Sequence, residues 1–123
     1  MIRGVRGAIT VDRNEEQHII EATEKLLVNM IEENEIEPEN VASVFISVTD
    51  DINSVFPAKA LRKFNGWTYV PVMCMQEIPV PNSLKFCIRI MIHLNTELAQ
   101  QDIRHAYLEK AIALRPDLKE TQQ

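Results

Sequence analysis

Strand-like and helix-like segments alternate along this chain, and their order restricts the possible fold more than any other feature of the sequence. Residues 2–11 alternate and are rich in β-branched side chains, which indicates a strand. Asn14, with Gln17 three residues later, is typical of a capping box at the start of a helix that ends near Asn34. Val41–Val48 is short and almost continuously apolar, which indicates a strand buried on both faces. Because strands and helices interleave, we expect at least one β-α-β crossover.

The second half of the chain predicts one further short helix and otherwise mainly strands. Pro57 begins this helix, and Asn65-Gly66 ends it. Residues 67–73 and 84–94 are predicted strands, and residues 107–114 are a last strand-like segment. The expected fold class is therefore α+β with an α/β-like order: a single domain with a β-α-β-α-β-β mixed sheet and helices packed on it.

Length and charge limit what the domain can do. The chain has 123 residues, which allows one domain over residues 1–118 and a flexible polar tail over residues 119–123. A domain of this size leaves about a third of its unfolded-chain surface exposed, so a site shared between copies is easier to build than a deep one within a single copy. The formal net charge of −5 argues against nucleic-acid binding. An anionic ligand would have to be held by locally clustered Arg or Lys.

Motifs for a cofactor, for a metal or for export are missing. The sequence contains no GxGxxG, Walker or GxSxG pattern, and its three His residues do not sit at metal-ligand spacing with its two Cys residues. We therefore expect no cofactor and no metal. No stretch is apolar enough for a signal peptide or a membrane span, and the two Cys residues are expected to be free thiols. The expected location is the cytoplasm.

Two arginines lie in unusual positions and point to chemistry. Arg6 interrupts an apolar strand, and Arg89 lies in the most apolar segment of the chain. A buried guanidinium without a partner is very costly, so each needs an anion nearby. An internal ion pair is the usual explanation for one such Arg, but two in a small acidic domain favour recognition of a bound carboxylate. Glu77, just after an apolar strand, fits a partner for Arg89, an ordinary exposed loop carboxylate or an acceptor for a substrate hydroxyl.

A resemblance to a known family rests on collinear blocks that cover nearly the whole chain without large gaps. These blocks are residues 2–8, 55–62, 66–77, 87–89, 104–110 and 114–118. Any one block would be weak, but together they are specific. They resemble the trimeric α/β chorismate mutases of Bacillus-like bacteria. Met73 departs from the family, which commonly has Thr there, and Pro81-Asn82-Ser83 replaces frequent glycines.

The resemblance implies a reaction and an assembly. It implies the [3,3] rearrangement of chorismate to prephenate in the shikimate pathway, on the way to phenylalanine and tyrosine. The assembly implied is a homotrimeric pseudo-α/β-barrel whose clefts lie between neighbouring subunits. No cofactor, nucleic acid or membrane is implied as a partner.

The resemblance also implies roles for individual residues. The residue matched by Arg6 binds a substrate carboxylate with help from the one matched by Tyr107. Arg89 matches the residue that reaches the ether oxygen and a carboxylate. Glu77 matches the acceptor of the ring hydroxyl, with Cys74 beside it. Met73 is expected in the cleft wall. Further expected cleft residues are Phe56, Lys59, Arg62 and Leu114 from the other subunit, and Arg115, which helps to close the cleft.

Two other interpretations stay open at the level of sequence. Small trimeric enamine/imine deaminases have a related arrangement and an Arg in an intersubunit cleft, where it binds a carboxylate and water is activated. A non-catalytic trimer that senses a small carboxylate would need the same arginines. The matches at Arg6 and Glu77 favour the mutase over the deaminase, and the retention of every matched polar residue argues against the sensor.

Overall fold

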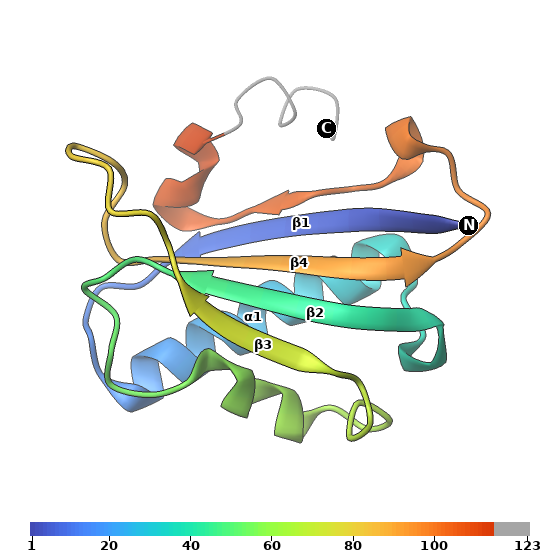
Figure 1. Cartoon of the computed structure of the whole chain (residues 1–123), viewed down its shortest axis with the longest axis horizontal. Helices are drawn as coiled ribbons and strands as arrows, with labels where there is room; N and C mark the ends of the chain where they lie inside the picture. Colours follow the sequence, from blue (N-terminus) through green and yellow to red (C-terminus); the bar gives the residue numbers. More distant parts are fainter. Residues whose placement is uncertain (115–123) are drawn as a thin grey trace.

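The structure, a computed structural model, describes residues 1–114 and consists of one sheet with one long helix across it (Figure 1). The predicted tail over residues 119–123, the predicted domain end at residue 118 and Arg115 lie outside the described residues. Short 3-10 helices, labelled η, occupy several of the connections. The elements are β1 (Ile2–Thr10), α1 (Glu16–Asn34), η1 (Pro38–Asn40), β2 (Val41–Val48), η2 (Pro57–Lys63), β3 (Val72–Gln76), β4 (Cys87–Asn95), η3 (Gln100–Asp102), β5 (Ala106–Tyr107) and η4 (Glu109–Leu114).

The sheet is mixed, with strand order β3-β2-β4-β1-β5 over the described residues. Strand β4 lies in the middle and runs antiparallel to both β1 and β2. The two outer pairs, β1 with β5 and β2 with β3, are parallel. Because β4 separates β1 from β2, the connection through α1 is a split β-α-β crossover. The predicted α+β class with a mixed sheet and helices packed on it is confirmed.

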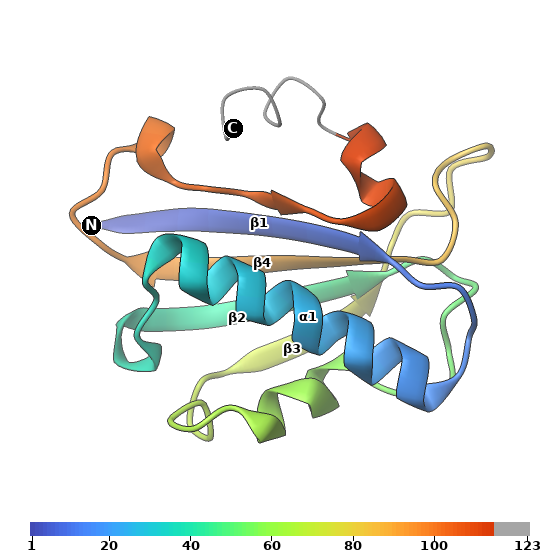
Figure 2. The same ribbon diagram turned by 180° about the vertical axis from the view of Figure 1, so that it is seen from behind.

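Helix α1 covers one face of the sheet and forms the core with it (Figure 2). Alternate strand residues face the helix, among them Val5 and Ile9 of β1, and both are fully buried. The helix contributes Leu26 and Met30 at helical spacing. Gly7 of β1 lies against Leu26 and Met30. Because Gly7 has no Cβ, the helix can approach the strand closely.

We expect Gly7→Ala to destabilise the fold, because a Cβ at Gly7 would lie 2.4 Å from Met30 Sδ and 3.0 Å from Leu26 Cδ1. Crowding of this kind in a packed core costs about 1–3 kcal/mol. Urea denaturation measures the change in the free energy of unfolding. The matched control is Gly4→Ala, where the new Cβ meets only Met91 Sδ at 3.1 Å on the other face of the sheet. An equal loss in both variants would contradict this account of the α1 contact.

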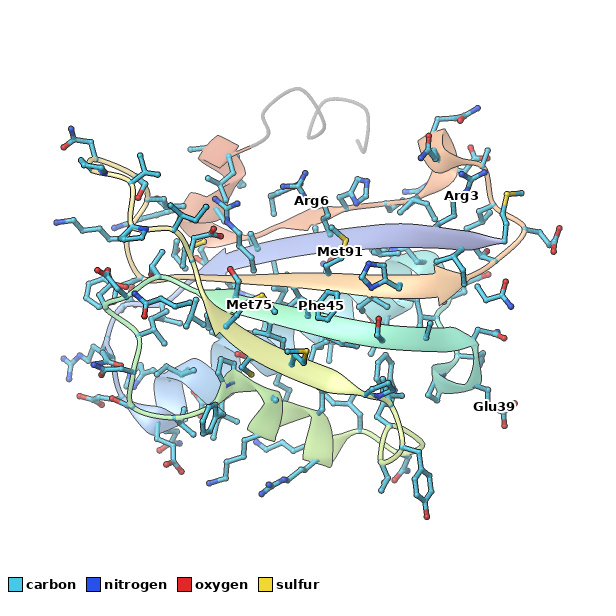
Figure 3. All side chains as sticks on the ribbon, viewed as in Figure 1. Arg3, Arg6, Glu39, Phe45, Met75 and Met91 are labelled. Atoms are coloured by element: carbon cyan, nitrogen blue, oxygen red, sulfur yellow. The ribbon has the colours of Figure 1, made fainter. Side chains whose placement is uncertain are left out.

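Among residues 1–114 no α-helix covers the opposite face of the sheet, which we call the open face. The short η4 packs against it, near β1 and β5. Figure 3 shows Arg6, Met91, Phe45 and Met75 along it, from β1 through β4 and β2 to β3. Phe45 and Met75 are 38% and 41% exposed. The prediction that Val41–Val48 is buried on both faces is therefore wrong for the single chain, because only one layer of helix is available to cover the sheet.

The start of α1 differs from the prediction. Its N-cap is Glu15, which makes no side-chain capping hydrogen bond. Asn14 Oδ1 instead accepts hydrogen bonds from the backbone N–H groups of Asn53 and Ser54 at 3.0 and 3.2 Å. The capping box predicted from Asn14 and Gln17 is therefore wrong, since a contact distant in sequence takes the capping side chain.

Two predicted strands also have different bounds. Residues 67–70 form a turn closed by a hydrogen bond from Val70 N to Trp67 O, and the strand begins only at Val72, after Pro71. The strand predicted over residues 107–114 ends at Tyr107. Glu109, with a φ of 56°, turns the chain into η4, which places the buried Ala111 against Ala8, Cys87 and Tyr107. None of the helices among residues 1–114 combines the length and the apolar character needed to cross a membrane.

Candidate active site

Arg89 lies in the middle of the open face. Its position on β4 is fixed on both sides, because it pairs with Ala8 of β1 and Ser47 of β2. Its side chain is 40% exposed, but its Nε atom is enclosed and makes no hydrogen bond within the described part of the chain. That Nε lies 3.4 Å from Glu77 Oε2. Arg89 therefore has a carboxylate close by, while one of its N–H donors stays unused.

Glu77 comes directly after β3 and reaches Arg89 across β2. Its backbone N–H donates to Val48 O at 2.7 Å, which fixes the chain at this point. Ser47 Oγ donates to Glu77 Oε2 at 3.0 Å, and the backbone N–H of Ile78 donates to Glu77 Oε1 at 3.2 Å. The sequence left open whether Glu77 is a partner of Arg89 or an acceptor for a ligand. The structure places it next to Arg89, and a half-buried carboxylate there can also accept from a ligand.

Arg6 and Tyr107 complete this part of the open face from β1 and β5. The backbone N–H of Arg6 donates to His105 Nδ1 at 3.0 Å, which ties β1 to the segment that leads into β5. Tyr107 pairs with Ala8, so its side chain lies beside Arg89 on the open face. Its hydroxyl oxygen is enclosed and has no hydrogen-bond partner in the range 1–114.

A hollow of about 230 Å³ brings these side chains together, and we call it the Arg89 hollow. Arg6, Arg89 and Tyr107 line it, so it offers two guanidinium groups and a phenol, and Glu77 lies within reach of Arg89. In a chain with a net charge of −5, this local excess of cationic donors selects for an anionic ligand. Leu114, Phe45, Ser47, Ala8 and Met91 supply most of the remaining wall.

Four other predicted cleft residues lie elsewhere on the chain, at η2 and on β3. We call them the edge group: Phe56, Lys59, Arg62 and Cys74. Phe56, Lys59 and Arg62 line a separate hollow of about 580 Å³. Phe56 is 76% exposed, so its ring has almost no cover within the chain. Lys59 Nζ contacts Glu16 Oε2 of α1 at 3.0 Å. This group presents apolar and cationic side chains without a facing wall.

Cys74 and Met73 lie on opposite faces of β3. Met73 is on the open face and is 61% exposed. Cys74 pairs with Ile46, packs against the core beneath η2 and lines a hollow together with Phe56. Burial raises the pKa of the Cys74 thiol, which favours the protonated form. Cys74 therefore belongs to the edge group and does not lie beside Glu77 of the same chain.

Within one chain, the predicted site residues thus fall into two groups on different surfaces. Leu114, which the resemblance assigns to the other subunit, lies in the Arg89 hollow of its own chain. Arg115 is outside the described residues. Residues 1–114 contain no cluster of His, Cys, Asp and Glu side chains suited to a metal ion.

Ser47 is a site residue that the sequence analysis missed. It is half-buried, lines the Arg89 hollow and donates to Glu77. The signal for it was present in the alternation of β2, where Ser43, Phe45 and Ser47 share one face while Val44 and Ile46 face the core. The interpretation of β2 as buried on both faces leaves no role for its serines in a site.

Comparison with known proteins finds relatives over nearly the whole chain. The family model for chorismate mutase type I matches residues 2–118. The curated chorismate mutase AroH of Bacillus subtilis (strain 168) is 53% identical over 98% of this chain and 95% of its own length. That of Thermus thermophilus is 45% identical over 99% of this chain and 100% of its own.

A solved structure leads to the same assignment. A chorismate mutase from Clostridium thermocellum superimposes with a TM-score of 0.87 and 44% identity, over 90% of this chain and 98% of that one. These matches favour the mutase interpretation over the deaminase and sensor interpretations. The chain therefore belongs to the chorismate mutase type I family.

Proposed function

We propose that the Arg89 hollow, completed by the edge group of a neighbouring copy in a homotrimer, is where this protein rearranges chorismate to prephenate. The observation that carries this proposal is a pair of enclosed donors, Arg89 Nε and Tyr107 Oη, that have no hydrogen-bond partner among residues 1–114. Unused donors of this kind are costly unless a ligand satisfies them. Both belong to residues that line one hollow with Arg6.

The reaction needs little beyond what this hollow offers. One C–O bond breaks as one C–C bond forms within the same molecule, so no nucleophile and no proton transfer is required. The protein must hold a dianion in a compact reactive conformer and stabilise the negative charge that grows on the ether oxygen. A millionfold acceleration requires about 8 kcal/mol, which one well-placed cation together with conformational restriction can supply.

Each polar residue has a task in this scheme. Arg89 donates to the ether oxygen, because a guanidinium stays protonated and its donors have a fixed geometry. Arg6 and Tyr107 bind a carboxylate of the substrate. Glu77 accepts from the ring hydroxyl, held in place by Ser47 and the backbone of Ile78. The edge group would close the other side of the substrate, with Arg62 as its exposed cation.

The trimer is proposed on two grounds. The predicted cleft residues occupy two surfaces of one chain, so one substrate can contact both only if another copy supplies the second surface. The open face also exposes several large apolar side chains, among them Phe45, Met73 and Met75, which is typical of a subunit interface. Sedimentation equilibrium should give three times the 14.1 kDa mass of the chain. A monomer that turns over chorismate would refute the shared site.

The proposed reaction is tested by product identification. Purified protein with chorismate, in buffer containing EDTA, should yield prephenate as the only product in an NMR spectrum. Ammonia release from enamine substrates should be absent. A folded trimer that leaves chorismate unchanged would overturn the proposed function while leaving the fold in place.

We expect Cys74→Ser to keep at least about a tenth of wild-type turnover, since the mechanism forms no covalent bond to the protein. The raised pKa of the Cys74 thiol also disfavours a thiolate nucleophile. Steady-state kinetics of the trimer measures this, with Cys87→Ser as the second cysteine variant. Complete loss of turnover in a folded trimer of Cys74→Ser would require a mechanism with a direct role for the thiol.

A cytoplasmic location stays a prediction. The two free thiols, Cys74 and Cys87, are consistent with it.

A further inference from the structure

We propose that Ser47 is a positioning residue for the rearrangement: its hydroxyl holds the Glu77 carboxylate in the geometry that receives the substrate hydroxyl beside Arg89. This inference rests on the proposed function. Strand β2 carries none of the residues matched to the family's site. The inference gives this strand a direct part in organising that site.

The sheet explains why such a residue is needed. Arg89 lies on β4 and Glu77 follows β3, and the two strands are separated by β2. Ser47 occupies the position on β2 between them, since it pairs with Arg89 on one side and with Met75 on the other. The serine side chain at this position is short enough to leave the hollow open, and it still reaches Glu77.

The hydrogen bonds around Glu77 show what Ser47 contributes. Its Oγ donates to Glu77 Oε2 at 3.0 Å, the same oxygen that lies 3.4 Å from Arg89 Nε without a hydrogen bond. The other oxygen, Oε1, accepts from the backbone of Ile78 at 3.2 Å and from no other described residue. Without the hydroxyl, nothing among the described side chains would keep Oε2 from closing onto Arg89 Nε. Ser47 therefore keeps the ion pair loose, so that both partners remain able to bind substrate.

A matched control exists on the same strand and the same face. Ser43 also uses its hydroxyl, but its partner is His93 Nδ1 at 3.0 Å, away from Arg89 and Glu77. Ser43→Ala removes the same atoms from the same kind of position. It lies outside the hollow that Arg6, Arg89 and Tyr107 line.

The test is a double-mutant cycle between Ser47 and Glu77, measured as kcat/KM for chorismate with the trimer checked for each variant. A hydrogen bond to a charged group predicts a loss of about tenfold or more in Ser47→Ala. Ser47→Thr, which keeps the hydroxyl, should recover most of it, and Ser43→Ala should stay within about twofold of wild type. In a Glu77→Ala background, Ser47→Ala should change kcat/KM by less than about twofold, because its partner is already gone.

Several outcomes would overturn the inference. One is a tenfold loss from Ser47→Ala in both the wild-type and the Glu77→Ala background. That result would mean that Ser47 acts on the substrate directly and not through Glu77. Another is wild-type kinetics in Ser47→Ala, or an equal loss in Ser43→Ala. These results leave wild-type turnover intact and so are distinct from failure of the proposed function, in which the wild type itself would be inactive.

Discussion

Arg89→Ala should lose most of its turnover while it still folds and assembles. Removing one preorganised donor from a developing oxyanion costs about 3–4 kcal/mol, or ~10²–10³ in kcat, and here a full charge is removed as well. The fold should tolerate the change, because the Arg89 side chain lies on the open face and is 40% exposed. Its strand pairing with Ala8 and Ser47 uses backbone atoms only.

Arg89→Lys separates charge from geometry. Lysine keeps the positive charge but presents it as a single point on a flexible stem, so it cannot donate in the fixed fork of a guanidinium. We expect this variant to be far below wild type in kcat. Steady-state kinetics, with circular dichroism and sedimentation of each variant, measures both effects. Near wild-type kcat in Arg89→Ala would remove Arg89 from the mechanism, and full activity in Arg89→Lys would show that charge alone is sufficient.

Glu77→Ala carries the second largest expected effect, a loss of about 10²-fold in kcat/KM. Two causes act together. The substrate hydroxyl loses its acceptor, and Arg89 loses the carboxylate whose Oε2 lies 3.4 Å from its Nε. An Arg left without that carboxylate is free to move away from the position that serves the ether oxygen.

Glu77→Gln distinguishes these two causes. The amide oxygen still accepts from a hydroxyl, while the negative charge near Arg89 is removed. We expect Glu77→Gln to be intermediate, with kcat/KM several times that of Glu77→Ala. If Glu77→Ala matched wild type, Glu77 would be only a structural partner of Arg89, which is the alternative that the sequence left open.

Regular features of the fold could be predicted from the sequence because local pattern decides them. The apolar residues of α1 repeat at helical spacing, and the β-branched residues Ile88, Ile90 and Ile92 of β4 recur at every second position, so local pattern predicts both elements. The errors occur where a distant contact or a turn overrides the local signal. Asn14 caps the loop at Asn53 instead of α1, and Glu109 turns the chain away from β5.

The candidate site was predictable only in part. Arg6 and Arg89 could be identified as unusual because a charge in an apolar strand needs an explanation. Their convergence on one hollow depends on strand order, since β1 and β4 are neighbours only in the folded sheet. The role of Ser47 was hidden for a similar reason. Its partner Glu77 is 30 residues away, and local pattern gives no information on such pairs.

The proposed chorismate site combines the Arg89 hollow of one copy with the edge group of its neighbour. Two variants inactivate the two halves separately. Arg89→Ala removes the central donor, and Phe56→Asp places a carboxylate in the edge group, where it would repel a dianionic substrate. Phe56 is 76% exposed in the chain, so this change should not disturb the core.

The most direct measurement is the chorismate mutase activity of trimers assembled from an equal mixture of these two variants by co-expression. If the site is shared, about a quarter of the sites combine an intact Arg89 with an intact neighbouring Phe56. Activity should then rise to about a quarter of wild type, while either variant alone, and the two purified trimers simply pooled, stay near background. Mixed trimers that remain as inactive as their parents would contradict the shared site.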